Sequence, residues 1–280
     1  MMRQMRLLSL SVMQIFRLTK NFCFQPARAS DAASGTQFNG EHSFMKLTKY
    51  GRREWGTATL VAAILLAGAI ACGFLFASNA GFYLSILVVA VWLLFVGFFR
   101  DPARAITTQD DILLSPADGL VKDIELIRAA DCPLLAEVFE GRDMLRVGIF
   151  LSVFNVHLNR APAPMTVKLS CHKDGCYYDA RDNRAIKENE SQMIAGIATV
   201  GGKEYPVAVK QISGAIARRI VCPVEPGRRL QRGERYGMIK FGSRTELYIP
   251  AKSDLEIAVR IGDKVQGGLT VLARQKHSNA

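Results

Sequence analysis

Two long uncharged stretches follow one another in the first third of the chain. Thr57 to Ala77 carries no charged residue, Ser78-Asn79 interrupts the pattern, and Ala80 to Phe99 is again uncharged. Each stretch is close to the roughly 20 residues that an α-helix needs to cross the hydrocarbon core of a membrane. Two such stretches joined by so short a turn predict a helical hairpin that associates with a membrane.

Basic residues flank both outer ends of this hairpin. They are Lys46, Lys49, Arg52 and Arg53 before it, and Arg100 and Arg104 after it. Because Lys and Arg are enriched in cytoplasmic loops, both ends are expected on the cytoplasmic face of the cell (inner) membrane. A buried hairpin of a soluble protein, a re-entrant hairpin and a hairpin lying on the membrane surface are the alternatives.

The net charge of +11 over 280 residues is compatible with nucleic acid or with an anionic membrane surface. The basic residues do not gather in a patch interleaved with aromatic residues, so a membrane is favoured and no nucleic-acid partner is expected. The six cysteines form no Cys-x-x-Cys pair, and Cys171-His172 with Cys176 lacks a fourth ligand at a suitable spacing. No metal site is therefore predicted, and a reducing compartment fits best.

Residues 1–44 differ from the rest of the chain. Met1 to Ser30 contains basic but no acidic residues, and Ser30 to Ser43 is rich in Ala, Ser, Gly and Asn. The first part is typical of an organellar presequence or a weak signal, and the second of an unstructured join. The alternative is a non-native extension, with Met45 as the true start.

Short β-rich runs alternate with turn signals after Asp101-Pro102. The runs cover residues 119–124, 145–151, 165–169, 205–212 and 254–259. This spacing predicts a mostly β (α+β) fold, with a barrel-like or sandwich-like domain over residues 105–280 that follows the hairpin at 45–104. The polar stretch from Asn183 to Ile194 is expected to be a loop with at most a short helix.

Two segments of this domain share a turn pattern. Ala117 to Val121 and Ile261 to Leu269 each place an Asp-Gly or Gly-Asp turn between apolar residues, as lipoyl or biotinyl carrier hairpins do. A membrane-anchored, non-enzymatic adaptor with a lipoyl-like β domain is therefore one interpretation of the chain. It lacks the carrier lysine in an exposed Met-Lys turn.

The stretch from Lys240 to Arg244 lies between two apolar segments and predicts a strand, a tight corner and another strand. Gly242 allows unusual backbone angles there, and Ser243 places a hydroxyl within reach of the preceding carbonyl. Taken alone, the dipeptide is typical of a β-turn.

Three other positions carry candidate chemistry. His157 is the best placed of four histidines for acid–base work near neutral pH, although a histidine among Val and Leu is commonly a core residue. Asp118 in an Asp-Gly turn is commonly structural. Arg218-Arg219 could hold a phosphate or carboxylate, or be a solvated pair on a strand edge.

Several of these segments together resemble one family. Their order is that of a phosphatidylserine decarboxylase proenzyme of the shorter, two-span bacterial type, over roughly Lys46 to Ala273. The segments are Ser115–Gly119, His157–Pro162, Asn189-Glu190, Ile216–Ile220 and Gly233–Arg244. The last of them is the most specific.

The resemblance implies that the chain cuts itself between Gly242 and Ser243 without hydrolysis. Ser243 would become a covalent pyruvoyl group, and the products would be a β chain 1–242 and an α chain 243–280 that form a heterodimer. The ketone would form a Schiff base with phosphatidylserine, release carbon dioxide and yield phosphatidylethanolamine. His157 is expected to donate the proton, and Asp118 to assist the base that activates Ser243.

One position departs from the pattern of longer relatives. They carry a second histidine three positions after the one that matches His157, where this chain has Arg160, a poor base. Either His157 serves both steps or another group starts the cleavage. Arg160, Arg218 and Arg219 are candidate substrate-binding residues, and another serine-headed lipid is an alternative substrate.

Overall fold

The computed structural model describes residues 46–75, 79–179, 182–215, 219–240 and 243–276. The expectations for residues 1–44, Gly242 and Arg218 lie outside the described residues.

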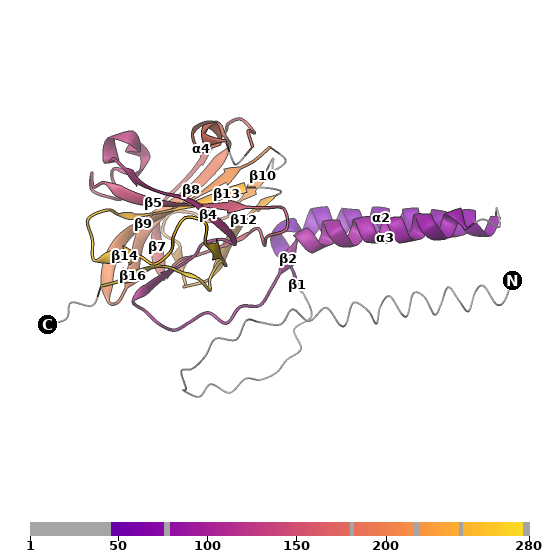
Figure 1. The fold of residues 1–280 in the computed structure, drawn as a ribbon, viewed down its shortest axis with the longest axis horizontal. Helices are drawn as coiled ribbons and strands as arrows, with labels where there is room; N and C mark the ends of the chain where they lie inside the picture. Colours follow the sequence, from indigo (N-terminus) through magenta and orange to yellow (C-terminus); the bar gives the residue numbers. More distant parts are fainter. Residues whose placement is uncertain (1–45, 76–78, 180–181, 216–218, 241–242, 277–280) are drawn as a thin grey trace. The chain divides into compact units, whose positions relative to one another are not determined.

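The two uncharged stretches form the expected helical hairpin. Its helices are α2 (Arg52–Leu75) and α3 (Ala80–Phe98), and Figure 1 shows them side by side. They approach closely at Gly81, where an added Cβ would lie 2.6 Å from the Cα of Gly73. Both helices are long and apolar enough to cross a membrane, and only 6% and 17% of their most apolar windows are buried. This exposure argues against a buried hairpin of a soluble protein.

The two outer ends of the hairpin are tied together. Strand β1 (Lys46–Leu47) pairs with β2 (Arg100–Asp101) in an antiparallel ladder. An apolar cluster, called here the hairpin-base cluster, joins these ends to the β domain, and both ends of the hairpin therefore emerge on the same side. Its buried members are Phe98, Phe99, Val156, Leu158 and Met238, with Leu47, Tyr50, Trp55 and Phe95 packed against them.

A curled antiparallel sheet forms the centre of the β domain and confirms the mostly β fold (Figure 1). Over the described residues its strand order is β11-β7-β8-β9-β13-β5-β4-β15. The strands are β4 (Gly119–Ile127), β5 (Met144–Leu151), β7 (Met165–Lys173), β8 (Ser191–Val200), β9 (Lys203–Ser213), β11 (Arg229–Leu230), β13 (Ser243–Pro250) and β15 (Lys264–Val265).

Two smaller sheets accompany it. One has the order β10-β12-β6 and the other β14-β16-β3. Their strands are β3 (Ile112–Leu114), β6 (Leu158–Arg160), β10 (Arg219–Val221), β12 (Arg235–Lys240), β14 (Leu255–Ile257) and β16 (Val271–Gln275). The main apolar core contains residues of all three sheets, among them Leu113, Val147, Tyr236 and Leu247.

Short helical segments interrupt the strands. They are η2 (Lys49–Gly51), η3 (Ala129–Asp131), η4 (Pro133–Leu135) and α4 (Asn183–Glu188). Helix α4 confirms the short helix expected after Asn183. The loop expected up to Ile194 is wrong, because β8 begins at Ser191. Ser191 pairs with Lys173 on one side and Ile212 on the other, so tertiary pairing overrides the polar start of this strand.

The two segments with Asp-Gly and Gly-Asp turns meet in space. In β15, Lys264 and Val265 pair with Leu120 and Gly119 of β4. The amide of Gly267 also donates to Asp118 Oδ1 at 2.8 Å. The shared pattern therefore corresponds to two turns that pack against each other.

Candidate active site

Ser243 is the first residue of β13, which lies between β5 and β9 in the central sheet. It pairs with Leu151 on one side and Ser213 on the other. Its side chain is fully buried, and its Oγ has no hydrogen-bond partner among the described residues. Because side chains alternate along a strand, Ser243 shares its face of the sheet with Thr245 and with core Leu247.

The strand that leads to Ser243 belongs to a different sheet. β12 ends at Lys240 and pairs with β6 and β10, whereas β13 pairs with β5 and β9. The corner predicted from sequence is therefore a crossing between sheets. Lys240 is buried, and its Nζ lies 2.5 Å from Glu54 Oε1 of helix α2. This ion pair holds the end of β12 against the hairpin.

His157 lies directly before β6 and is fully buried. The Phe98 ring at the end of α3 packs on its imidazole, with 4.4 Å between the ring centroids. The carbonyl of His157 accepts a hydrogen bond from the amide of Ile239 at 3.1 Å. The hairpin and β12 therefore both contact this histidine.

The hydrogen bonds of His157 fix its tautomer. Nδ1 lies 2.9 Å from the carbonyl oxygen of Asn155, and because a carbonyl can only accept, Nδ1 carries the proton. Burial lowers the pKa of His157 from 6.5 to about 4, with help from the charge of Arg100 and against the Asn155 bond and Asp118. The imidazole is thus neutral at pH 7 and keeps a lone pair on Nε2. That atom is buried without a partner in the described part of the chain.

The fold brings His157 and Ser243 to the same corner. Asn159 lies two residues after His157, and Thr245 lies two residues after Ser243. Asn159 Nδ2 donates to Thr245 Oγ1 at 3.0 Å, and this bond links β6 to β13. Leu151 pairs with Ser243 across the sheet, and the turn that begins after Leu151 leads directly to His157. A buried nucleophile-type hydroxyl and a neutral imidazole therefore lie at one crossing.

Asp118 has other partners. Arg104 holds its carboxylate with two hydrogen bonds of 2.6 and 2.7 Å, and Gly267 donates a third from its amide. Neither ring nitrogen of His157 bonds to Asp118. Its charge still acts on the histidine, where it favours the protonated form. The contact between Arg104 and Asp118 was not predicted from the sequence, where Arg104 stands out only as a basic residue after the hairpin.

The arginines predicted to bind substrate are placed differently from one another. Arg160 is buried and donates to the carbonyls of Gly233 at 3.0 Å and Pro102 at 3.2 Å. Burial lowers its pKa to about 10, so it stays charged at neutral pH. Arg219 is exposed at the start of β10. Arg160 therefore acts in this fold as a tie between segments, and its role in substrate binding stays a prediction.

The opposite face of β13 carries a buried network of charged groups. Arg244 makes two 2.7 Å hydrogen bonds to Asp123 and one of 2.8 Å to Glu246. Glu246 also accepts from Tyr248 Oη at 2.6 Å, and Arg146 bonds to Asp123 at 3.2 Å. Burial acts to raise the pKa of Asp123, but the hydrogen bonds and charges of Arg244 and Arg146 together lower it. These residues are called the Arg244 network below.

A glycine makes room for this network. A Cβ added to Gly148 would lie 1.9 Å from Arg244 Nη2. The guanidinium therefore occupies space that any other residue at position 148 would take. This network is not apparent from the sequence, because its members are separated by up to 125 positions along the chain.

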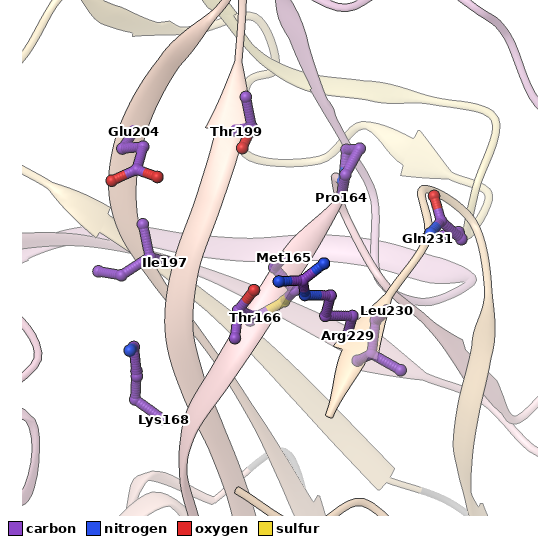
Figure 2. A pocket seen from close by; sticks show the side chains of 10 residues that line it. All are labelled: Pro164, Met165, Thr166, Lys168, Ile197, Thr199, Glu204, Arg229, Leu230 and Gln231. Atoms are coloured by element: carbon purple, nitrogen blue, oxygen red, sulfur yellow. The ribbon is translucent and has the colours of Figure 1, made fainter. Parts of the chain in front are cut away.

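A cavity of about 460 Å³ lies elsewhere, at the β11 end of the central sheet (Figure 2). Its lining includes Met165 and Lys168 of β7, Ile197 of β8, Glu204 of β9 and Arg229 of β11. It contains none of the predicted site residues. Over the described ranges, no group of three or more His, Cys, Asp or Glu residues is arranged to hold a metal ion.

Comparisons with known proteins agree with the order of the motifs. Residues 91–273 match the family model described as phosphatidylserine decarboxylase. A relative from Wolbachia pipientis wMel, named phosphatidylserine decarboxylase proenzyme, is 45% identical over 187 residues, which cover 67% of this chain and 78% of the relative. A relative of the same name from Geobacter metallireducens is 40% identical over 193 residues, or 69% of this chain and 83% of the relative. The chain belongs to the phosphatidylserine decarboxylase family, a family of enzymes.

Proposed function

We propose that the chain is a proenzyme that cuts itself at Gly242-Ser243, and that the product decarboxylates phosphatidylserine to phosphatidylethanolamine in phospholipid biosynthesis. One observation carries the proposal beyond family membership. Ser243 Oγ and His157 Nε2 are both buried without a partner among the described residues, although buried polar groups in proteins are nearly always hydrogen-bonded. A buried polar group without a partner lowers the stability of the fold, and such groups are commonly found at active sites.

The self-cleavage follows from these two groups. Nε2 of neutral His157 takes the proton of Ser243 Oγ, and the oxygen attacks the carbonyl carbon of Gly242. The amide becomes an ester, and the nitrogen of Ser243 takes up a proton. Loss of the Cα proton of Ser243 and of the Gly242 carboxylate leaves dehydroalanine at 243. Tautomerisation and hydrolysis by one water release ammonia and leave a pyruvoyl group on the 243–280 chain.

The surroundings of Ser243 fit that group. The ketone retains the carbon atoms of Ser243 at the start of an interior strand, and Ser213 on β9 offers a hydroxyl with no other partner in the described residues. Once formed, the pyruvoyl ketone supplies an electron sink for the α-carbon of a serine headgroup. Neutral His157 takes up a proton from the ammonium group of the serine headgroup and then returns it to that carbon. Burial lowers the pKa of His157 to about 4, so its protonated form gives the proton up readily.

The hairpin supports a lipid substrate. We infer that residues 45–104 anchor the protein in the inner membrane and that residues 105–280 form the decarboxylase domain on the cytoplasmic face. The apolar helices and their basic outer ends support this placement. Asp118 and its partner Arg104 then lie where the hairpin joins the domain, and we propose that Asp118 acts on His157 through its charge.

Intact mass and a denaturing gel of the purified chain test the proposal. The unmodified protein is expected to yield the 243–280 fragment, with loss of ammonia relative to simple scission, whereas Ser243→Ala stays uncut. A fully uncut chain in active preparations would overturn the mechanism and favour the adaptor. Turnover of phosphatidylserine against another serine-headed lipid, such as an archaeal-type ether lipid, then distinguishes the two substrates.

A further inference from the structure

The turn between β5 and His157 exposes two apolar side chains. Phe154 is 73% exposed and Val153 is 40% exposed. The amide of Asn155 donates to the Ser152 carbonyl at 2.9 Å, and the Ser152 amide donates to Asn155 Oδ1 at 2.9 Å. These bonds close the turn at its base. Val153 and Phe154 therefore form its tip, which is called here the Phe154 tip.

The Phe154 tip is joined to the base of the hairpin. Arg100, the first residue of β2 just after α3, donates to the carbonyl oxygen of Phe154 and to that of Gly97 at 3.1 Å. Val156 packs in the hairpin-base cluster with Phe98. The tip is thus fixed beside the point where the apolar helix leaves the β domain.

The same turn connects the two groups of the proposed reaction. It begins after Leu151, the strand partner of Ser243, and the Asn155 carbonyl accepts the Nδ1 proton of His157. A displacement of this turn therefore acts directly on the imidazole.

We propose that Val153 and Phe154 insert into the surface of a phospholipid bilayer beside the hairpin and form the edge over which the lipid headgroup reaches Ser243. This inference rests on the proposed function and adds its lipid-entry surface. An aromatic side chain with its neighbouring cation suits the interface between hydrocarbon and headgroups. Arg100 and Val156 join the Phe154 tip to the apolar hairpin. A bilayer that contains the hairpin would therefore also contact the tip.

Tryptophan fluorescence tests the insertion. Phe154→Trp is made in a Trp55→Phe, Trp92→Phe chain, whose self-cleavage verifies folding, and is reconstituted in vesicles of phosphatidylcholine with brominated acyl chains. The expected result is a blue-shifted emission that the brominated lipid quenches. Leu134→Trp in the same background is the matched control, because Leu134 is exposed in η4 and is not part of the hairpin-base cluster.

Each outcome separates the inference from the proposed function. A Trp55→Phe chain that keeps Trp92 is measured in the same vesicles. Quenching of Trp92 in that chain, without quenching of Trp at 154, would overturn the inference and leave the membrane hairpin standing. No quenching of Trp92 would instead contradict the membrane anchor. A blue shift at 154 without quenching would assign the tip to a second copy of the chain, which also overturns the inference.

Turnover gives a second readout. Phe154→Asp is expected to lower the ratio of turnover on vesicles to turnover on monomeric short-chain phosphatidylserine by about tenfold, the equivalent of losing one buried aromatic contact. Leu134→Asp should keep the ratio of the unmodified protein. An unchanged ratio in Phe154→Asp would contradict the entry surface.

Discussion

The two faces of strand β13 treat buried polar groups in opposite ways. On one face, Ser243 Oγ and its neighbour Ser213 Oγ are buried without partners in the described structure. On the other, Arg244 and Glu246 are equally buried, but each pairs with opposite charge. An unpaired buried group costs about 1–3 kcal/mol, whereas a complete network rigidifies its surroundings. The strand is therefore held by its Arg244 face. The face with Ser243, which we propose to be the reactive one, keeps its unpaired hydroxyls beside the bond between Asn159 and Thr245.

The largest expected effect tests the reactive face. His157→Gln removes the lone pair on Nε2 and should slow self-cleavage by about 10²- to 10⁴-fold, the usual contribution of a general base. The loss of uncut chain over time on a denaturing gel measures it. His172→Gln, at a half-exposed position on β7, is the control. Cleavage of His157→Gln at the unmodified rate would assign the base to another group.

Breaking the paired face should reduce stability. Glu246→Gln in a Ser243→Ala chain is expected to lower the free energy of unfolding by about 1.5–3 kcal/mol, because Arg244 loses one charged partner while it keeps Asp123. Urea unfolding in detergent measures the change. Glu140→Gln, which breaks an exposed pair with Arg142, should change it by less than about 1 kcal/mol. If both substitutions lowered the free energy of unfolding equally, the buried Arg244 network would contribute no more than an exposed ion pair.

Acid should destabilise the reactive face through His157. Its pKa is about 4 when folded and 6.5 in the reference state, so the unfolded chain binds more protons between these values. Stability is therefore lost as the pH falls from 6.5 towards 4, by roughly 3 kcal/mol. Unfolding of Ser243→Ala is compared with Ser243→Ala, His157→Phe at pH 7 and pH 4. The second chain should lose less stability on acidification, and identical losses would argue against a depressed pKa.

The smallest effect compares two hydroxyls near β13. Ser213→Ala removes a hydroxyl without a partner in the described residues and should leave stability unchanged or slightly higher. Thr245→Val removes the acceptor of the 3.0 Å bond from Asn159 and should cost about 1 kcal/mol. Both are measured by urea unfolding in the Ser243→Ala chain. The reverse order would contradict the assignment of partners.

The sequence predicted the hairpin and several of the longer strands, and it singled out Ser243 and His157, whose roles stay predictions. Charge-free stretches and alternating apolar residues are local signals, and they predicted α2, α3, β4, β5 and β9. Ser243 and His157 were found by residue type together with the order of motifs. These features share one property: the information lies within a few neighbouring residues.

Features that depend on distant partners were missed. Strand β8 begins with Ser191, which pairs only once β7 and β9 lie on either side of it. Arg104 is fourteen positions from Asp118, and nothing local indicates that it binds that carboxylate. The same holds for Arg244, whose partner Asp123 comes from another strand.

The position of β13 has a consequence for the lifetime of the mature protein. Both neighbours of this strand, β5 and β9, lie upstream of Ser243, and β16 and β15 pair with upstream β3 and β4. A cut before Ser243 leaves these ladders intact but turns refolding into a reaction between two molecules. The proposed reaction also consumes the Ser243 hydroxyl, which a second cleavage would need. The working life of each enzyme molecule is then set by how slowly it unfolds, not by an equilibrium that it can re-enter.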